Sequence, residues 1–109
     1  RDIVIHSKII FSGNQADGSG KIGLCYGNNA FDGYRFVLEH SSYRDFCIKK
    51  LTGGNDNSGT VLAESTSISL NNNMANLYFV DTISNEGTLR QKLTYNGNNY
   101  EITGNDNEY

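Results

Sequence analysis

Leu89-Arg-Gln-Lys-Leu-Thr-Tyr-Asn-Gly-Asn-Asn-Tyr-Glu-Ile-Thr103 carries the clearest structural signal in the chain. Asn96-Gly97 separates two runs in which apolar and polar residues roughly alternate. A two-residue Asn-Gly connection favours a type I′ turn, because both central residues of that turn need a positive φ. The sequence therefore predicts an antiparallel hairpin with one strand from Leu89 to Tyr95 and the next from Asn99 to Thr103.

The rest of the chain repeats this pattern. Near the N-terminus, Ile3, Ile5 and Ile9 fall on one face at a period of two, whereas His6 and Lys8 fall on the other. Gly, Asn and Asp separate such segments about every ten residues, and no window of about eleven residues keeps a helical period. We expect an all-β fold of about eight strands with little or no helix, arranged as a small antiparallel Greek key β-sandwich or as a small barrel. The other expected strands cover 22–26, 33–40, 43–51, 61–70 and 77–82.

The length of 109 residues and the apolar share of 37% fit one domain, residues 1–109, with a single modest core. No apolar run is long enough to cross a bilayer. The last six residues, Gly104 to Tyr109, are polar and terminal, so we expect them to fray.

The formal net charge is -3. Such a chain lacks the basic field that holds a phosphate backbone, which argues against a nucleic-acid partner. The charge is uneven along the sequence: residues 1–54 carry seven basic and five acidic side chains, and residues 55–109 carry two and seven. The two halves could present opposite potentials, or they could form an ordinary mixed surface.

The two cysteines, Cys25 and Cys47, enclose a loop of about 22 residues, and a disulfide closing it could contribute about 3 kcal/mol. Neither a CxxC motif nor Cys/His spacing for a metal is present, which favours a disulfide in an oxidising compartment. Two buried thiols are the alternative. Since the first residue is Arg1 rather than Met, we expect an exported, matured protein that is secreted.

Candidate catalytic groups are few. His6 and His40 could act with a carboxylate as general acid and base, as in metal-free nucleases. Glu39 and His40 are adjacent in a predicted strand, however, so their side chains point to opposite faces and cannot flank one substrate. Asp17-Gly-Ser-Gly20 has the centre of a calcium-binding EF-hand loop but lacks the carboxylates at its two ends. We therefore predict no metal site and no cofactor.

Part of the chain resembles the βγ-crystallin Greek key family. RFVLEHSSYRDF, residues 35–46, is similar to that family's first hairpin, although Asp45 stands at the position of its Gly. Residues 65–70 and 77–81 are similar to the family's Ser-Ser-Ile-x-Val strand and to the start of a second motif. The resemblance covers roughly Tyr34 to Leu93 and implies a Greek key β-sandwich. Leu62 and Ala63 occupy the family's calcium-ligand positions, so it does not imply a calcium site.

These observations favour a small secreted, non-enzymatic module that binds a host or extracellular macromolecule, in particular a protein, as effectors, virulence factors, toxin-like domains and adhesins do. The longest polar loops give the expected contact residues, Asp17, Asn55 and Asp56. We expect a monomer with no membrane span. Two alternatives remain open: a crystallin-type stress or structural protein, and a small secreted hydrolase or nuclease that uses His6 or His40.

Overall fold

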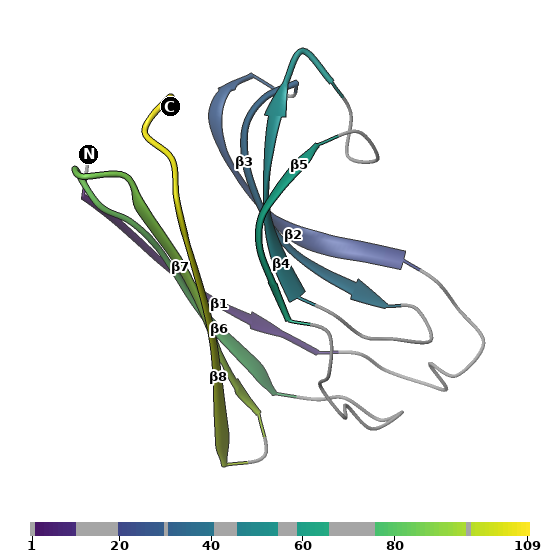
Figure 1. Cartoon of the computed structure of the whole chain (residues 1–109). Helices are drawn as coiled ribbons and strands as arrows, with labels where there is room; N and C mark the ends of the chain where they lie inside the picture. The colour runs from purple at the N-terminus through teal and green to yellow at the C-terminus, as the bar shows by residue number, and fades with distance from the viewer. Residues whose placement is uncertain are drawn as a thin grey trace.

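The computed structural model describes residues 2–10, 20–29, 31–40, 46–54, 59–65, 76–95 and 97–109 (Figure 1). These residues form eight strands, as the sequence predicts, and contain no helix. Among them there is accordingly no helix that is long and apolar enough to span a membrane. The strands are β1 (Ile3–Ile9), β2 (Gly20–Asn29), β3 (Asp32–His40), β4 (Phe46–Thr52), β5 (Thr60–Ser65), β6 (Leu77–Ile83), β7 (Thr88–Tyr95) and β8 (Asn98–Asn105).

The strands form two antiparallel four-stranded sheets, with the orders β1-β6-β7-β8 and β2-β3-β4-β5. We call them the β1 sheet and the β2 sheet. Within each sheet, consecutive strands are direct neighbours, and only β1 joins strands distant from it in sequence. This order is a meander rather than the 4-1-2-3 order that a Greek key produces within a sheet. The chain crosses between the sheets after β1 and again after β5.

The Asn96-Gly97 hairpin is confirmed. In the register of β7 and β8, Tyr95 lies opposite Asn98 and Thr94 lies opposite Asn99. Gly97 has a φ of 76°, in the left-handed region that the expected turn requires. The Thr94 hydroxyl also donates a hydrogen bond to Asn99 Oδ1 at 2.7 Å, which ties the two strands together beside the turn.

The two sheets face each other across one hydrophobic core. Inward-facing side chains alternate with outward-facing ones, so β6 and β7 each bury every second residue. Both sheets contribute to the same cluster of buried side chains. Its members are Tyr34, Phe36, Leu38, Phe46 and Ile48 from the β2 sheet, and Leu77, Phe79, Ile83, Leu89, Leu93 and Ile102 from the β1 sheet.

The sheets come closest on one side, where β5 and β4 face β8 and β7. Gly104 of β8 permits this approach, because a Cβ atom there would lie 3.1 Å from both the Cβ and the carbonyl oxygen of Leu62. On the opposite side the outer strands are β1 and β2. The inward-facing residues of β1, such as Ile5 and Ile9, remain only half-buried there. The space between the sheets is therefore closed at β5 and β8 and more open at β1 and β2.

The predicted disulfide is wrong, because Cys25 and Cys47 are not bonded to each other. Strand β3 lies between their strands, which places them about 10 Å apart across the sheet. They are also offset along the sheet, since Cys25 lies opposite Arg35 whereas Cys47 lies opposite Val37. A disulfide needs Cα atoms within about 7 Å of each other. Secretion was inferred in part from this disulfide, so that part of the inference no longer holds.

This geometry predicts how the two thiols react. Cys25 is exposed and Cys47 is buried, so iodoacetamide should modify Cys25 in the native protein and Cys47 only after unfolding. A reducing agent should leave the melting temperature of the monomer unchanged within about 1 °C, because it has no structural disulfide to break. Intact-mass measurement before and after denaturation tests this prediction. A native mass that lacks two hydrogens, with no alkylation of either residue, would contradict it.

The C-terminal residues differ from the expected frayed tail. Gly104 and Asn105 belong to β8 and lie opposite Leu89 and Thr88. The following segment, Asp106–Tyr109, leaves the β1 sheet and reaches β3 and β4 of the other sheet. We call this segment the clasp.

The contacts of the clasp centre on Tyr34 and Lys50. The Tyr34 hydroxyl donates to Asp106 Oδ1 at 2.7 Å and accepts from the Tyr109 backbone N–H at 3.2 Å. Lys50 Nζ lies 2.8 Å from Asp106 Oδ2 and 2.6 Å from Glu108 Oε2. The two tyrosine rings meet edge to face, with centroids 5.4 Å apart, and the Tyr109 hydroxyl donates to the Leu51 carbonyl at 2.9 Å. The clasp thus ties one sheet to the other.

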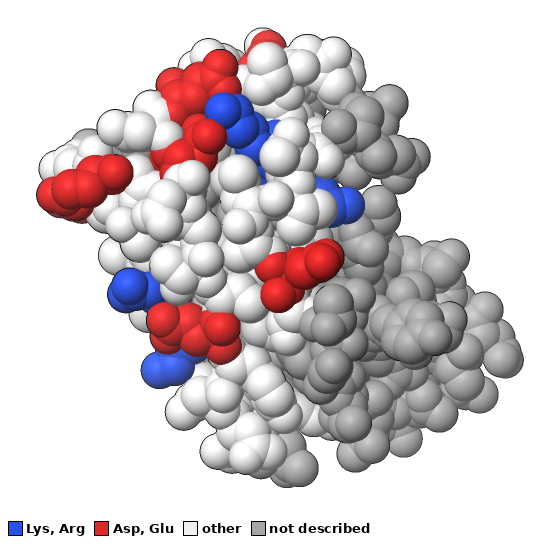
Figure 2. Space-filling model, viewed as in Figure 1, with Lys and Arg blue, Asp and Glu red and all other residues white. Residues whose placement is uncertain are grey.

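Acidic and basic side chains lie close together on the part of the surface that the structure describes. Figure 2 shows both kinds interspersed on the visible face. Lys50 from the first half of the chain pairs with two carboxylates from the second half, and Arg90 pairs with Glu101 at 3.1 Å. Because β1 lies beside β6, basic and acidic parts of the sequence also share one sheet.

Candidate functional site

The candidate residues predicted from the sequence fall mainly outside the part of the chain that the structure describes. Asp17, Asn55 and Asp56 lie outside the described residues, as does the side chain of His40. His6 is exposed on the outer face of β1, where its register partner is Val80. The next residue of β6, Asp81, faces inward, so the sheet itself separates His6 from this carboxyl group.

Two polar side chains lie at the centre of the inner face of the β1 sheet. Asp81 of β6 and Gln91 of β7 are direct cross-strand partners, and each is only 2% exposed. Their neighbours at the other inward positions of β6 and β7 are apolar: Leu77, Phe79, Ile83, Leu89 and Leu93. The two polar residues therefore interrupt an otherwise continuous apolar surface.

One acceptor atom of each side chain is left without a hydrogen-bond donor by the part of the chain that the structure describes. Asp81 Oδ1 and Gln91 Oε1 are both buried, and no described group donates a hydrogen bond to either atom. A buried acceptor without a donor typically costs about 1 to 3 kcal/mol, and a charged one costs more. Two such atoms on facing residues are thus an expensive arrangement at the centre of a core, and they call for a physical explanation.

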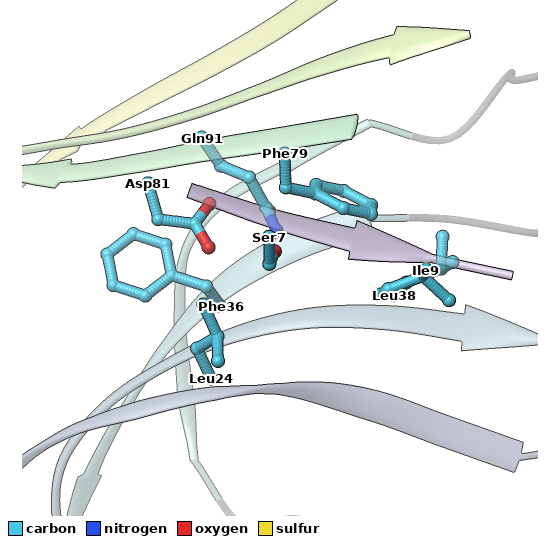
Figure 3. Close-up of a pocket in the computed structure, with 8 residues that line it drawn as sticks. All are labelled: Ser7, Ile9, Leu24, Phe36, Leu38, Phe79, Asp81 and Gln91. Carbon is cyan, nitrogen blue, oxygen red and sulfur yellow. The ribbon is translucent and has the colours of Figure 1, made fainter. Parts of the chain in front are cut away.

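Both residues line a cavity of about 190 Å³ between the two sheets. We call this cavity the inter-sheet pocket. Figure 3 shows the Asp81 carboxyl and the Gln91 amide directed into it, with Phe36 and Ser7 close by. The remaining walls are apolar and come from both sheets: Ile9, Leu24, Leu38 and Phe79. A mainly apolar concave space with a few convergent polar groups is the usual form of a small-molecule site.

The edge strands β1 and β2 bring the pocket toward solvent. Ser7 and Ile9 face inward from β1, and Leu24 faces inward from β2; all three are only half-buried. In the register of β1 and β6, Ile5 lies opposite Asp81 and Ser7 lies opposite Phe79, so Ser7 is the diagonal neighbour of Asp81. The pocket consequently lies toward the open side of the fold, between the deep pair Asp81–Gln91 and the outer strands.

Burial determines the electrostatics of the pocket. It raises the pKa of the Asp81 carboxyl to about 7, because the ionised form loses its hydration. No described Lys, Arg or His lines the pocket to offset this effect. At neutral pH, Asp81 therefore exchanges between the neutral and ionised forms. A carboxyl group with such a pKa inside a pocket is typical of functional sites.

The pocket does not have the composition of a metal centre. Among the described residues that line it, Asp81 is the only carboxylate, and there is no His or Cys. Over all the described ranges, no group of three or more His, Cys, Asp or Glu residues is placed to hold a metal ion. Leu62 and Ala63, at the calcium-ligand positions of the crystallin resemblance, are half-buried and pack against the core instead.

The sequence does contain a signal for this site. In each of three strands that become neighbours, a polar residue stands at an inward position of an apolar alternation. The three residues are Ser7, Asp81 and Gln91. The signal could be used only with knowledge that β1 pairs with β6, since Ser7 and Asp81 are far apart in sequence. Comparison of the chain with protein-family models, curated proteins and solved structures found no match.

Proposed function

We propose that this chain is a binding module, and that its ligand places a compact, mainly apolar group in the inter-sheet pocket with a hydrogen-bond donor against Asp81 and Gln91. The observation that carries the proposal is the pair of buried acceptors, Asp81 Oδ1 and Gln91 Oε1, which face a cavity of about 190 Å³ without a donor from the described chain.

The size of the cavity defines what can enter. An apolar cavity of about 150 Å³ holds a benzene molecule. The inter-sheet pocket can therefore hold one six-membered ring and a small polar substituent. The aromatic and branched walls would bury the ring, and the substituent would supply the donor that the two acceptors lack. Burying a group of this size typically contributes about 2 to 3 kcal/mol, so the expected dissociation constant for such a fragment is about 5 to 35 mM.

The wider interpretation of the sequence remains a proposal beside this one. A secreted module of two antiparallel sheets that binds a host or extracellular protein through Asp17, Asn55 and Asp56 is compatible with the all-β fold, and a partner side chain could occupy the same pocket. Small free fragments test the pocket alone, because their binding does not depend on contacts of Asp17, Asn55 or Asp56 with a partner.

A blocking variant tests the pocket directly. Ser7→Phe places a ring into the cavity from the half-buried strand β1, and Val4→Phe adds the same ring on the outer face of β1, where Val4 is 60% exposed. In a protein-observed NMR titration with benzyl alcohol or benzylamine, we expect shifts at Leu24, Phe36 and Phe79 for the wild type and for Val4→Phe. The Ser7→Phe variant should show none.

Two results would contradict the proposal. One is the absence of shifts at these residues with both compounds up to about 200 mM, well above the expected dissociation constant. The other is an unchanged titration in a folded Ser7→Phe variant, which would place the binding elsewhere.

A further inference from the structure

We infer that the inter-sheet pocket selects primary amines: a ligand with an ammonium group on a compact apolar body, whose N–H donors meet the Asp81 carboxylate and the Gln91 amide oxygen. This inference rests on the proposed function and specifies the ligand's polar group.

The number and type of the unpartnered atoms favour an ammonium group. Asp81 Oδ1 and Gln91 Oε1 are both acceptors on facing residues, so one ligand group with several donors can satisfy both. An ammonium group has three donors and no acceptor, whereas a hydroxyl group has one donor and brings acceptor lone pairs of its own. The Ser7 hydroxyl, which also lines the pocket, can accept the third ammonium hydrogen.

The distribution of charge around the pocket also favours an ammonium ligand. The described groups that face Asp81 are all uncharged: Ile5 and Ser7 from β1, Gln91 from β7, Phe36 and Leu38 from β3, and Leu24 from β2. The nearby cations of β1 and β7, such as Lys8, Arg90 and Lys92, alternate to the outer face. Within the described part of the chain no cation stands beside this carboxylate, so a ligand cation would supply the opposite charge, in surroundings where an ion pair is strong.

The remaining walls accept the body of such a ligand. Phe36 and Phe79 come from opposite sheets and present their rings to the same cavity. Aromatic faces also attract an ammonium group and the adjoining polarised CH₂ group. An aromatic or branched aliphatic amine with about the bulk of benzylamine satisfies both requirements.

The pH dependence of binding distinguishes an amine from a neutral donor. Asp81 titrates at a pKa of about 7 in the unliganded protein. An ammonium group binds the ionised carboxylate, so its affinity should rise about tenfold from pH 6 to pH 8 and then level off. An aliphatic ammonium group remains protonated through this range. A neutral ligand that favours the protonated carboxyl group should show the opposite trend.

The experiment compares benzylamine, benzyl alcohol and toluene by NMR titration of the wild type at pH 6 and pH 8. At pH 8 we expect benzylamine to bind at least about tenfold more tightly than benzyl alcohol, with toluene weakest. In Asp81→Asn, which keeps the shape and removes the charge, benzylamine should lose both its advantage over the alcohol and its pH dependence. Binding of all three compounds should be lost in Ser7→Phe.

The outcomes separate the two proposals. If benzyl alcohol binds as tightly as benzylamine at pH 8, or if benzylamine binds more weakly as the pH rises, the amine inference is overturned and the pocket itself stands. If none of the three compounds shifts the resonances of the pocket residues, the proposed function fails together with the inference. Retained amine selectivity in Asp81→Asn would show that Asp81 is not the group that recognises the charge.

Discussion

Replacing Asp81 by Asn should stabilise the protein at pH 8 and have a much smaller effect at pH 5. Burial raises the pKa of this carboxyl group to about 7 in the folded protein, whereas an unfolded chain has a value near 4. The folded state therefore binds the proton more tightly than the unfolded state. The wild type is most stable where Asp81 is protonated, and it loses stability as the pH rises from about 4 to about 7.

The size of this stability loss follows from the pH range between the unfolded and folded pKa values of Asp81. Each pH unit between the two pKa values represents about 1.4 kcal/mol, so the full window costs about 4 kcal/mol at most. Between pH 5 and pH 8, the advantage of Asp81→Asn in unfolding free energy should grow by about 3 kcal/mol and should then remain constant at higher pH. Urea denaturation of both proteins at several pH values measures this difference.

A control separates the effect from general charge removal. Glu86→Gln removes an exposed carboxylate from the turn between β6 and β7, so its effect on stability should change by less than about 0.5 kcal/mol over the same range. If the stability difference between wild type and Asp81→Asn were independent of pH, then Asp81 would titrate normally and the account of the buried pair would be wrong.

Removal of the clasp should destabilise the protein strongly. A chain that ends at Asn105 loses the partner of the Tyr34 hydroxyl, both carboxylates beside Lys50 and the Tyr109 ring. Tyr34 is 0% exposed, so the deletion uncovers a core residue and leaves its hydroxyl without these partners. We expect a loss of about 3 to 5 kcal/mol and a fall in melting temperature of roughly 10 to 20 °C.

Point variants show which contacts of the clasp matter. Tyr34→Phe removes the hydroxyl that contacts both Asp106 and Tyr109, and it should cost about 1 to 2 kcal/mol. Thr103→Ala is a control at an exposed position of β8, close before the clasp, and it should cost less than Tyr34→Phe. Stability within about 1 kcal/mol of the wild type after the deletion would show that the contacts do not hold the sheets together.

The clasp also responds to pH in the opposite sense to Asp81. Partial burial works to raise the pKa of Asp106, but hydrogen bonds from Lys50, from the Glu108 backbone and from Tyr34 lower it overall. Because the folded state lowers this pKa, the contribution of Asp106 to stability is present above the unfolded value and is lost as the pH falls through the folded value. Acid should therefore weaken the clasp while it relieves the cost of burying Asp81.

Local patterns were enough to predict the strands but not their partners. The hairpin at Asn96-Gly97 depends on neighbouring residues, and the structure has it as predicted. The pairing of Cys25 with Cys47 was inferred from their number and spacing, which do not show that β3 runs between them. Sequence separation is a poor guide to distance in a sheet, because two strands can be close along the chain and still be separated by a third.

The candidate site was missed for the same reason. Asp81 and Gln91 stand in strands that the sequence predicts, yet each residue taken alone resembles a polar position on a half-exposed strand. Only the fold shows that both point inward, that Ser7 of a distant strand joins them, and that Phe36 covers them from the other sheet. The clasp was missed likewise, since the polar tail finds its partners Tyr34 and Lys50 more than fifty residues away.

The open side of the fold has a consequence for behaviour in concentrated solution. Among the described strands, β1 and β2 each have a neighbour on one side only, so each sheet presents there a row of backbone groups that another chain could extend. Proteins often interrupt such edges with proline, but this chain has none. On β1 the side chains that discourage added strands are His6 and Lys8, next to the exposed Val4. Resistance to aggregation at this edge therefore depends on charge, and it weakens when salt screens that charge.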